Sequence, residues 1–255
     1  MAGPHVERVQ GDIMPVNSYL IHGPSGLVIV DGQLTLSDAD KVRRAIDAAN
    51  VPVASMVLTH GHPDHYAGAD RMLAGLDAPI IATAGADRVI RRDDDEKAAV
   101  VGPMMGDEWP ARRRFPDEIV NDGDAVSRGG IELVVRNYGP AESADDTVWS
   151  LGDEAAFIGD LAYNQMHAYL ADGHHAAWLS ALSALEADLP GSATLYVGHG
   201  PPGGRELLAR QREYVTTFVD EVARVAEVDA EERRRSMVER MQRVVPGEQL
   251  LFLME

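Results

Sequence analysis

The densest chemical signal in the chain is a run of four side chains that can bind metal. The run follows the apolar stretch Ala54 to Leu58 and reads His60-Gly61-His62-Pro63-Asp64-His65. Imidazole and carboxylate are both metal ligands, and a loop shaped by glycine and proline can turn them toward one point. A lone histidine is more often a surface or core residue, but this density favours a metal site.

Two later segments place a ligand type directly after an apolar strand. The first ends at Gly159-Asp160 and the second at Gly198-His199-Gly200. An aspartate after glycine is more often a turn residue, so each segment alone is only moderately specific. Together, and in this order after the first motif, they favour a shared site. The chain has no cysteine, which leaves nitrogen and oxygen as the ligand atoms.

With the Asp31-Gly32 turn, these motifs resemble those of the metallo-β-lactamase superfamily over most of the chain. The resemblance implies an α/β fold, the αββα four-layer sandwich, with two divalent metal ions at one edge. Zinc is the first expectation, with manganese or iron as alternatives. Asp31 is expected to orient ligand histidines, as outer carboxylates often do. The ligand set that the resemblance implies is His60 and His62 for metal one, Asp64, His65 and His199 for metal two, and Asp160 as the bridge.

The sequence departs from the family where a third histidine of metal one is expected. The matching turn is Gly139-Pro140-Ala141-Glu142, and no histidine occurs between His65 and His167. We therefore expect Glu142 to be an oxygen ligand of metal one, which would tilt that site toward harder ions such as Mn²⁺ or Fe²⁺. The alternative is a surface glutamate on a turn, with water in the third position.

The resemblance implies a metal-dependent hydrolase, with Asp64 the catalytic residue as well as a ligand. Two ions about 3.5–4 Å apart would hold a bridging hydroxide that attacks an electrophilic centre. A small ester, lactone or thioester is the expected substrate, because the family name says little about individual members. One alternative is a mononuclear iron oxygenase of the sulfur-dioxygenase kind, using His60, His62 and Glu142. Another is a non-catalytic metal-binding protein with a closed structural site.

Composition limits the partners. The net charge of −18 over 255 residues disfavours nucleic acid, so a small-molecule substrate is expected. No apolar run is long enough for a transmembrane helix, and Met1 to Gln10 lacks the features of a signal peptide, so no membrane partner and a cytoplasmic location are expected. The apolar ending Leu250 to Leu253 could pack on its own domain or on a second copy, which leaves a homo-oligomer open.

We expect one domain over residues 1–255. Ser37 looks like a helix N-cap. Residues Ala86 to Pro116 look irregular and are expected to form a lid over the site. Tyr163, His167 and Trp109 are the expected substrate-binding residues. Strands are expected at Ile13 to Ile21, Gly26 to Val30, Ala54 to Leu58, Ile131 to Asn137, Thr147 to Leu151, Ala155 to Ile158 and Thr194 to Val197, with a final helix over Leu207 to Val222.

Overall fold

The structure is a computed structural model that describes residues 5–247 and residue 250. Its first sheet begins with antiparallel strands and continues as parallel ones from β3 onward. The strand order follows the chain: β1 (His5–Gln10), β2 (Asn17–Gly23), β3 (Gly26–Val30), β4 (Val53–Val57), β5 (Ile80–Thr83) and β6 (Glu118–Val120). Parallel strands place their carboxyl ends at one edge, so the loops after β3 and β4 meet there.

The second sheet is mainly antiparallel, with β10 and β11 as its parallel pair. Its strand order is β11 (Thr194–Val197), β10 (Ala155–Gly159), β9 (Asp146–Leu151), β8 (Ile131–Gly139) and β7 (Ala125–Arg128). β10 and β11 also end at a common edge, where Asp160 and His199 follow them.

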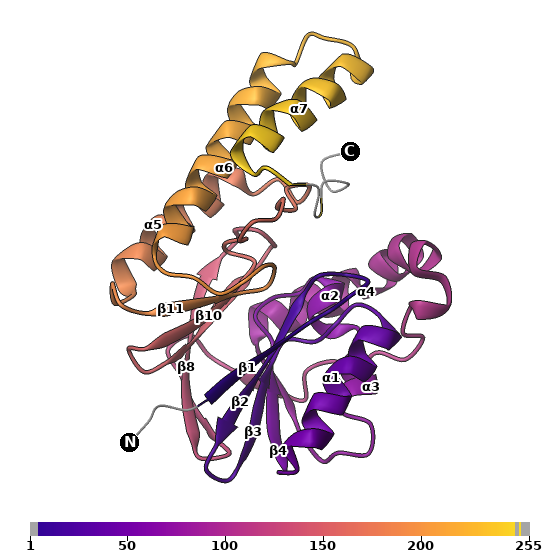
Figure 1. Cartoon of the computed structure of the whole chain (residues 1–255), viewed down its shortest axis with the longest axis vertical. Helices are drawn as coiled ribbons and strands as arrows, with labels where there is room; N and C mark the ends of the chain where they lie inside the picture. The colour runs from indigo at the N-terminus through magenta and orange to yellow at the C-terminus, as the bar shows by residue number, and fades with distance from the viewer. Residues whose placement is uncertain (1–4, 248–249, 251–255) are drawn as a thin grey trace.

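Helices cover the outer faces of both sheets (Figure 1). The first sheet carries α1 (Leu36–Ala49), α2 (Pro63–Tyr66), α3 (Ala69–Met72) and α4 (Ala84–Met105), with the short 3₁₀ turn η1 (Gly106–Glu108) after it. The second sheet carries α5 (His175–Asp188), α6 (Glu206–Arg224) and α7 (Ala230–Val244). In Figure 1, α6 and α7 form a hairpin that extends beyond the sheets.

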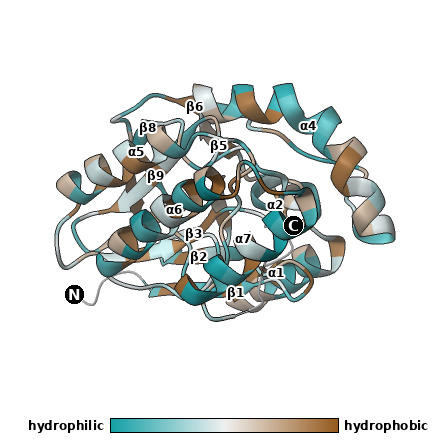
Figure 2. Cartoon of the chain, turned by 90° about the horizontal axis from the view of Figure 1, so that it is seen from above, coloured by the Kyte–Doolittle hydropathy of each residue, from teal (hydrophilic) through white to brown (hydrophobic). Residues whose placement is uncertain are grey.

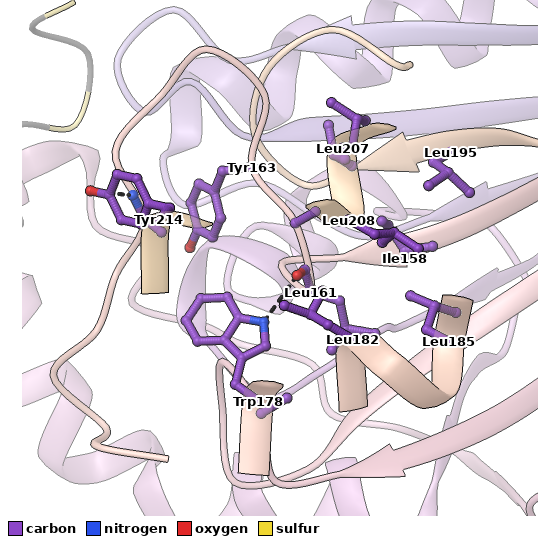
Figure 3. Packing of buried hydrophobic residues seen from close by; sticks show 14 of the residues in the cluster. Ile158, Leu161, Tyr163, Trp178, Leu182, Leu185, Leu195, Leu207, Leu208 and Tyr214 are labelled. Carbon is purple, nitrogen blue, oxygen red and sulfur yellow. Dashed lines mark hydrogen bonds between the residues drawn. The ribbon is translucent and has the colours of Figure 1, made fainter. Parts of the chain in front are cut away.

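Successive side chains of a strand point to opposite faces of its sheet. The apolar ones form three clusters, one at each interface between the four layers. Val28 and Val30 face the second sheet, whereas Leu27 and Ile29 face α1. The helices on the far side pack on a third cluster around Ile158, Leu182 and Leu208, part of which Figure 3 shows. This arrangement confirms the predicted αββα sandwich.

Residues Ala86 to Pro116 differ from the prediction of an irregular lid, because most of them form the 22-residue helix α4. Thr83 caps its start, and Ala86, Val89 and Ile90 are buried at helical spacing. Glycine and proline near its end hid this periodicity: the helix continues through Pro103 and ends at Gly106, which has a φ of 56°.

Other differences are local. Thr35, rather than Ser37, caps α1, and Ser37 donates hydrogen bonds to the Glu108 carboxylate. Helix α7 was not anticipated, because it is mostly polar and buries only Met237 and Met241. Of the apolar ending, only Leu250 lies within the described residues. Within those residues, no helix combines the length and apolar character needed to cross a membrane. Figure 2 shows polar and apolar segments mixed along the outer helices.

Candidate metal centre

The motif loop is anchored by Asp31, which follows β3 with a φ of 60°. Its carboxylate accepts hydrogen bonds from the Thr59 amide and the Thr59 hydroxyl, both at 2.8 Å. The same carboxylate lies 2.9 Å from Nδ1 of His65. Asp31 therefore fixes the loop backbone and one histidine ring together, which is the orienting contact that the sequence predicted for it.

The side chains of four histidines, His60, His62, His65 and His199, lie close together. One ring nitrogen of each lies within hydrogen-bond distance of a neighbouring group. Nδ1 of His60 is 3.1 Å from the Thr59 hydroxyl, and Nδ1 of His199 is 2.9 Å from the Pro15 carbonyl. For His62 the engaged nitrogen is Nε2, which lies 3.1 Å from Asp172. The remaining nitrogens face one another and the carboxylates of the site, as ligand atoms must.

Two glycines let the later ligands approach closely. Gly159 has a φ of 50°, and a Cβ there would lie 2.5 Å from the Thr59 hydroxyl oxygen. A Cβ on Gly198 would lie 1.9 Å from Oδ1 of Asp160. Real Cβ atoms do not make such contacts, so the Gly-Asp and Gly-His pairs are a packing requirement of the site.

Glu142 lies inside the site, not on the surface, and is 2% exposed. Its turn is held by Asp146, which accepts hydrogen bonds from the amide and hydroxyl of Ser143. Oε2 of Glu142 is 2.9 Å from Nδ1 of His62 and 3.5 Å from Nε2 of His60. The surface-turn alternative is therefore wrong, and the carboxylate stands beside the two histidines predicted for metal one.

Asp160 contacts both histidines of the second group and shares a set of ligand atoms with His60. Its Oδ1 is 3.4 Å from Nε2 of His65, and its Oδ2 is 3.3 Å from Nε2 of His199. Asp64 completes the second group, with Oδ2 at 3.1 Å from Nε2 of His199. Ligand atoms gather in three overlapping sets: His60, His62 and Glu142; His60, His65 and Asp160; and Asp64, His65 and His199.

Unsatisfied polar atoms test whether these residues fit metal ions. Nε2 of His60, Nε2 of His65, Oε2 of Glu142 and Oδ1 of Asp160 are all buried without a hydrogen-bond partner among the described residues. Burying such atoms unpaired is costly, so they need a partner that the side chains do not provide. A cation surrounded by nitrogen and oxygen ligands satisfies all four.

Burial and neighbouring charges have opposite effects on the pKa values of the site residues. Burial raises the pKa of the Glu142 carboxyl to about 6, although His62 acts to lower it. For His199, burial lowers the pKa, but the carboxylates of Asp160 and Asp64 outweigh it and raise the value to about 10. The neighbouring carboxylates also raise the pKa of His62 and His65, whereas burial lowers the pKa of His60, so ion binding would displace protons from His62, His65 and His199.

Comparison with known proteins gives the same family as the motifs. The family model described as "Metallo-beta-lactamase superfamily" matches residues 11–199, which contain every ligand candidate above. The chain belongs to the metallo-β-lactamase superfamily. Within it, the chain is 24% identical over 183 residues to a hydroxyacylglutathione hydrolase from Methylobacillus flagellatus, covering 71% of this chain and 60% of that protein.

A second superfamily relative is an (R)-specific secondary-alkylsulfatase from a Pseudomonas species. It is 37% identical over 71 residues, which is 26% of this chain and 10% of that protein. Among solved structures, a metallo-beta-lactamase family protein from Thermus thermophilus has a TM-score of 0.71 and 19% identity. That match covers 100% of this chain and 92% of the other. This likeness shows the superfamily fold, and the chain spans less than two thirds of both curated relatives.

The superfamily site forms one end of a cavity of about 370 Å³. Helix α4 supplies much of its apolar wall, so the segment predicted as a lid does border the site. Tyr163 lines the cavity as expected. The remaining lining residues are Met14, Leu34, His62, Pro63, Asp64, Lys97, Val100, Val101, Met104, Met105, Glu142, Asp160, Tyr169, His199 and Leu250.

Two predicted substrate residues lie elsewhere. His167 is fully buried, and its ring nitrogens face the Tyr214 hydroxyl at 2.9 Å and the Gly247 carbonyl at 3.2 Å. Trp109 packs against Arg113, whose guanidinium carbon is 5.4 Å from its ring centre. Both are packing residues, because neither reaches the cavity wall.

Three residues near the site were missed from the sequence: Lys97 and Tyr169, which line the cavity, and Asp172, which contacts His62. Nδ1 of His62 faces Glu142, while its ring meets Tyr169 edge-on with centroids 5.3 Å apart. Lys97 Nζ lies 5.5 Å from the Tyr169 ring centre. None follows a strand or belongs to a motif, and Asp172 is 110 residues from its partner His62. Tyr169 and Asp172 belong to the segment between β10 and α5, and Lys97 belongs to the segment that was expected to cover the site, but no motif marks any of the three.

Proposed function

We propose that this chain is a dinuclear metal-dependent hydrolase of a small ester, lactone or thioester that carries an apolar group. The observation that supports this most is the overlap of the ligand sets at one end of the apolar cavity. Asp160 belongs to the middle set, which shares His60 with the first set and His65 with the third, so two ions held there would lie on either side of this carboxylate. A closed structural site would instead use its ligands in a single shell, away from a cavity.

The residues of metal one would be His60, His62 and Glu142, and those of metal two Asp64, His65 and His199. Two divalent ions in such a site supply a hydroxide at neutral pH and polarise the bond under attack. Zinc is the proposed ion, with manganese or iron as alternatives because Glu142 adds a hard oxygen ligand. The net reaction adds water across the ester bond.

Tyr163 is the residue placed to assist the substrate oxygen. Its hydroxyl lies 2.5 Å from Oδ2 of Asp160 and 3.1 Å from Oε1 of Glu142, and its ring stacks on His199. Burial raises the pKa of Tyr163 well above its usual value, so the phenol stays a hydrogen-bond donor at neutral pH. Donation to the developing negative charge on the substrate would stabilise the transition state.

The apolar wall of the cavity supports a substrate with a hydrocarbon part. Val101 and Met105 of α4 line the same cavity as the metal-ligand candidates. The names of the two relatives add a hydroxyacylglutathione and a secondary alkyl sulfate to the compounds worth testing. Sulfate esters therefore belong in the panel beside carboxylic esters, lactones and thioesters.

The test is elemental analysis of the purified protein, followed by that substrate panel. The proposal expects two ions per chain and hydrolysis of at least one ester class, abolished by Asp160→Ala. Two bound ions with no turnover on any class would overturn the hydrolase proposal.

The oxygenase alternative has one observation in its favour. His60, His62 and Glu142 form a group of two histidines and one carboxylate, the facial pattern of non-haem iron enzymes. Oxygen uptake with a thiol or persulfide substrate, together with one iron per chain, would favour it. The intact second set of Asp64, His65 and His199 supports the hydrolase instead.

A further inference from the structure

The ring of His62 lies between two carboxylates, those of Glu142 and Asp172. Nδ1 is 2.9 Å from Oε2 of Glu142, and Nε2 is 3.1 Å from Oδ2 of Asp172. Asp172 belongs to the segment between β10 and α5, outside every motif in the chain. Its carboxylate is 25% exposed, whereas that of Glu142 is fully buried.

We propose that Asp172 is a positioning residue that fixes the ring of His62 for metal one; this rests on the proposed function. A ligating imidazole is neutral, so one nitrogen binds the ion and the other keeps its hydrogen. Asp172 accepts the Nε2 hydrogen of His62. The Nδ1 lone pair is then directed at the place where Glu142 also presents its Oε2 atom.

The position of His62 in the chain explains why it needs this contact. It is the N-cap residue of α2, a helix of one turn, and its side chain makes no capping hydrogen bond. His65 is held by Asp31 and His199 by the Pro15 carbonyl, both from the strand-bearing core. Among the described contacts of His62, Asp172 is the acceptor for the ring nitrogen that points away from Glu142.

Lys97 holds Asp172 in turn. Its Nζ lies 4.0 Å from Oδ1 of Asp172, which leaves Oδ2 directed at His62. The ring of Tyr169 lies beside both His62 and Lys97. Helix α4, which carries Lys97, is therefore connected to His62 through Lys97 and Asp172.

The experiment measures metal affinity by competition with a chromophoric chelator, using Zn²⁺ as the probe. Asp172→Ala should weaken one of the two binding constants by about 10–100-fold and leave the other near its wild-type value. Asp172→Asn keeps an acceptor oxygen and should recover most of the affinity. Asp95→Ala, which removes an exposed carboxylate of α4, is the matched charge control and should change neither constant.

A second readout separates positioning from a general loss of structure. In the Zn²⁺-loaded protein labelled with ¹⁵N-histidine, His62 should show a protonated Nε2 that exchanges slowly with water. Asp172→Ala should lose this protected hydrogen, while His65 keeps its pattern. Equal affinities for Asp172→Ala and wild type would overturn the inference. Two tightly bound ions without hydrolysis would overturn the proposed function instead and leave this inference standing.

Discussion

Oε2 of Glu142 lies 2.9 Å from Nδ1 of His62, at the position where the superfamily resemblance implies a third histidine. The contact places a carboxylate that is 2% exposed next to a histidine predicted to bind metal one. As a ligand of metal one, this carboxylate would make the site harder and more negative than an all-histidine one.

Glu142→His should fold normally and shift metal preference toward Zn²⁺ over Mn²⁺ by about tenfold or more, because imidazole replaces a hard oxygen. The change also removes one negative charge. A bound water then loses its proton more easily, so the midpoint of the rising limb of the pH–rate profile should fall. Metal competition and pH–rate profiles measure both effects. An unchanged preference would mean that residue 142 does not reach the metal.

Asp160→Ala should lower metal content at both positions and reduce turnover at least about 100-fold, since a shared carboxylate serves both ions. Elemental analysis and kinetics on the substrate found in the panel give the two numbers. Asp153→Ala, an exposed aspartate in the turn before β10, is the control and should keep both ions. Retention of two ions by Asp160→Ala would contradict the bridging role.

The α4 wall should select substrates by apolar length. Each methylene that enters the cavity is worth about 0.8 kcal/mol, so kcat/KM should rise about fourfold per added carbon until the space is filled. Val101→Asp should abolish this gain with little effect on the shortest substrate. Val219→Asp, on an exposed position of α6, is the control. A length dependence that survives Val101→Asp would exclude α4 as the substrate wall.

Trp149 should stabilise both the fold and the motif loop. It is fully buried between the sheets, and its indole Nε1 donates to the Leu58 carbonyl at 2.9 Å. Trp149→Phe removes that donor and leaves a void, for an expected loss of about 2–4 kcal/mol in the free energy of unfolding. Urea unfolding of the metal-free protein measures it. A loss below about 1 kcal/mol would show that the contact is dispensable.

Short motifs after strands were the part of the site that the sequence predicted well. His60, Asp160 and His199 each follow an apolar strand, and strand ends sit at fixed places on a sheet edge. Glu142 could be placed only through the family resemblance, because its turn has no pattern that specifies a buried carboxylate. Its burial depends on Asp146 and Ser143, whose contacts are invisible in the sequence.

Contacts between segments that lie far apart in the chain could not be predicted from the sequence. Asp172 contacts His62, and Lys97 lies near Asp172, each from a segment far from His62 in the chain, and no local periodicity predicts these contacts. His167 failed for the related reason that a histidine close to Asp160 in the chain points away from it, toward Tyr214. The α4 helix was missed because its glycines and Pro103 suggested irregular chain, while tertiary packing of Ala86 and Ile90 kept the helix intact.

The most direct test of the account is a crystal structure of the metal-loaded protein, with anomalous scattering used to locate the ions. The account predicts two ions joined by Asp160. A Glu142 oxygen should lie roughly 2.0–2.2 Å from the ion that His60 and His62 bind. A well-ordered structure with a single ion, or with Glu142 turned away from both ions, would contradict it.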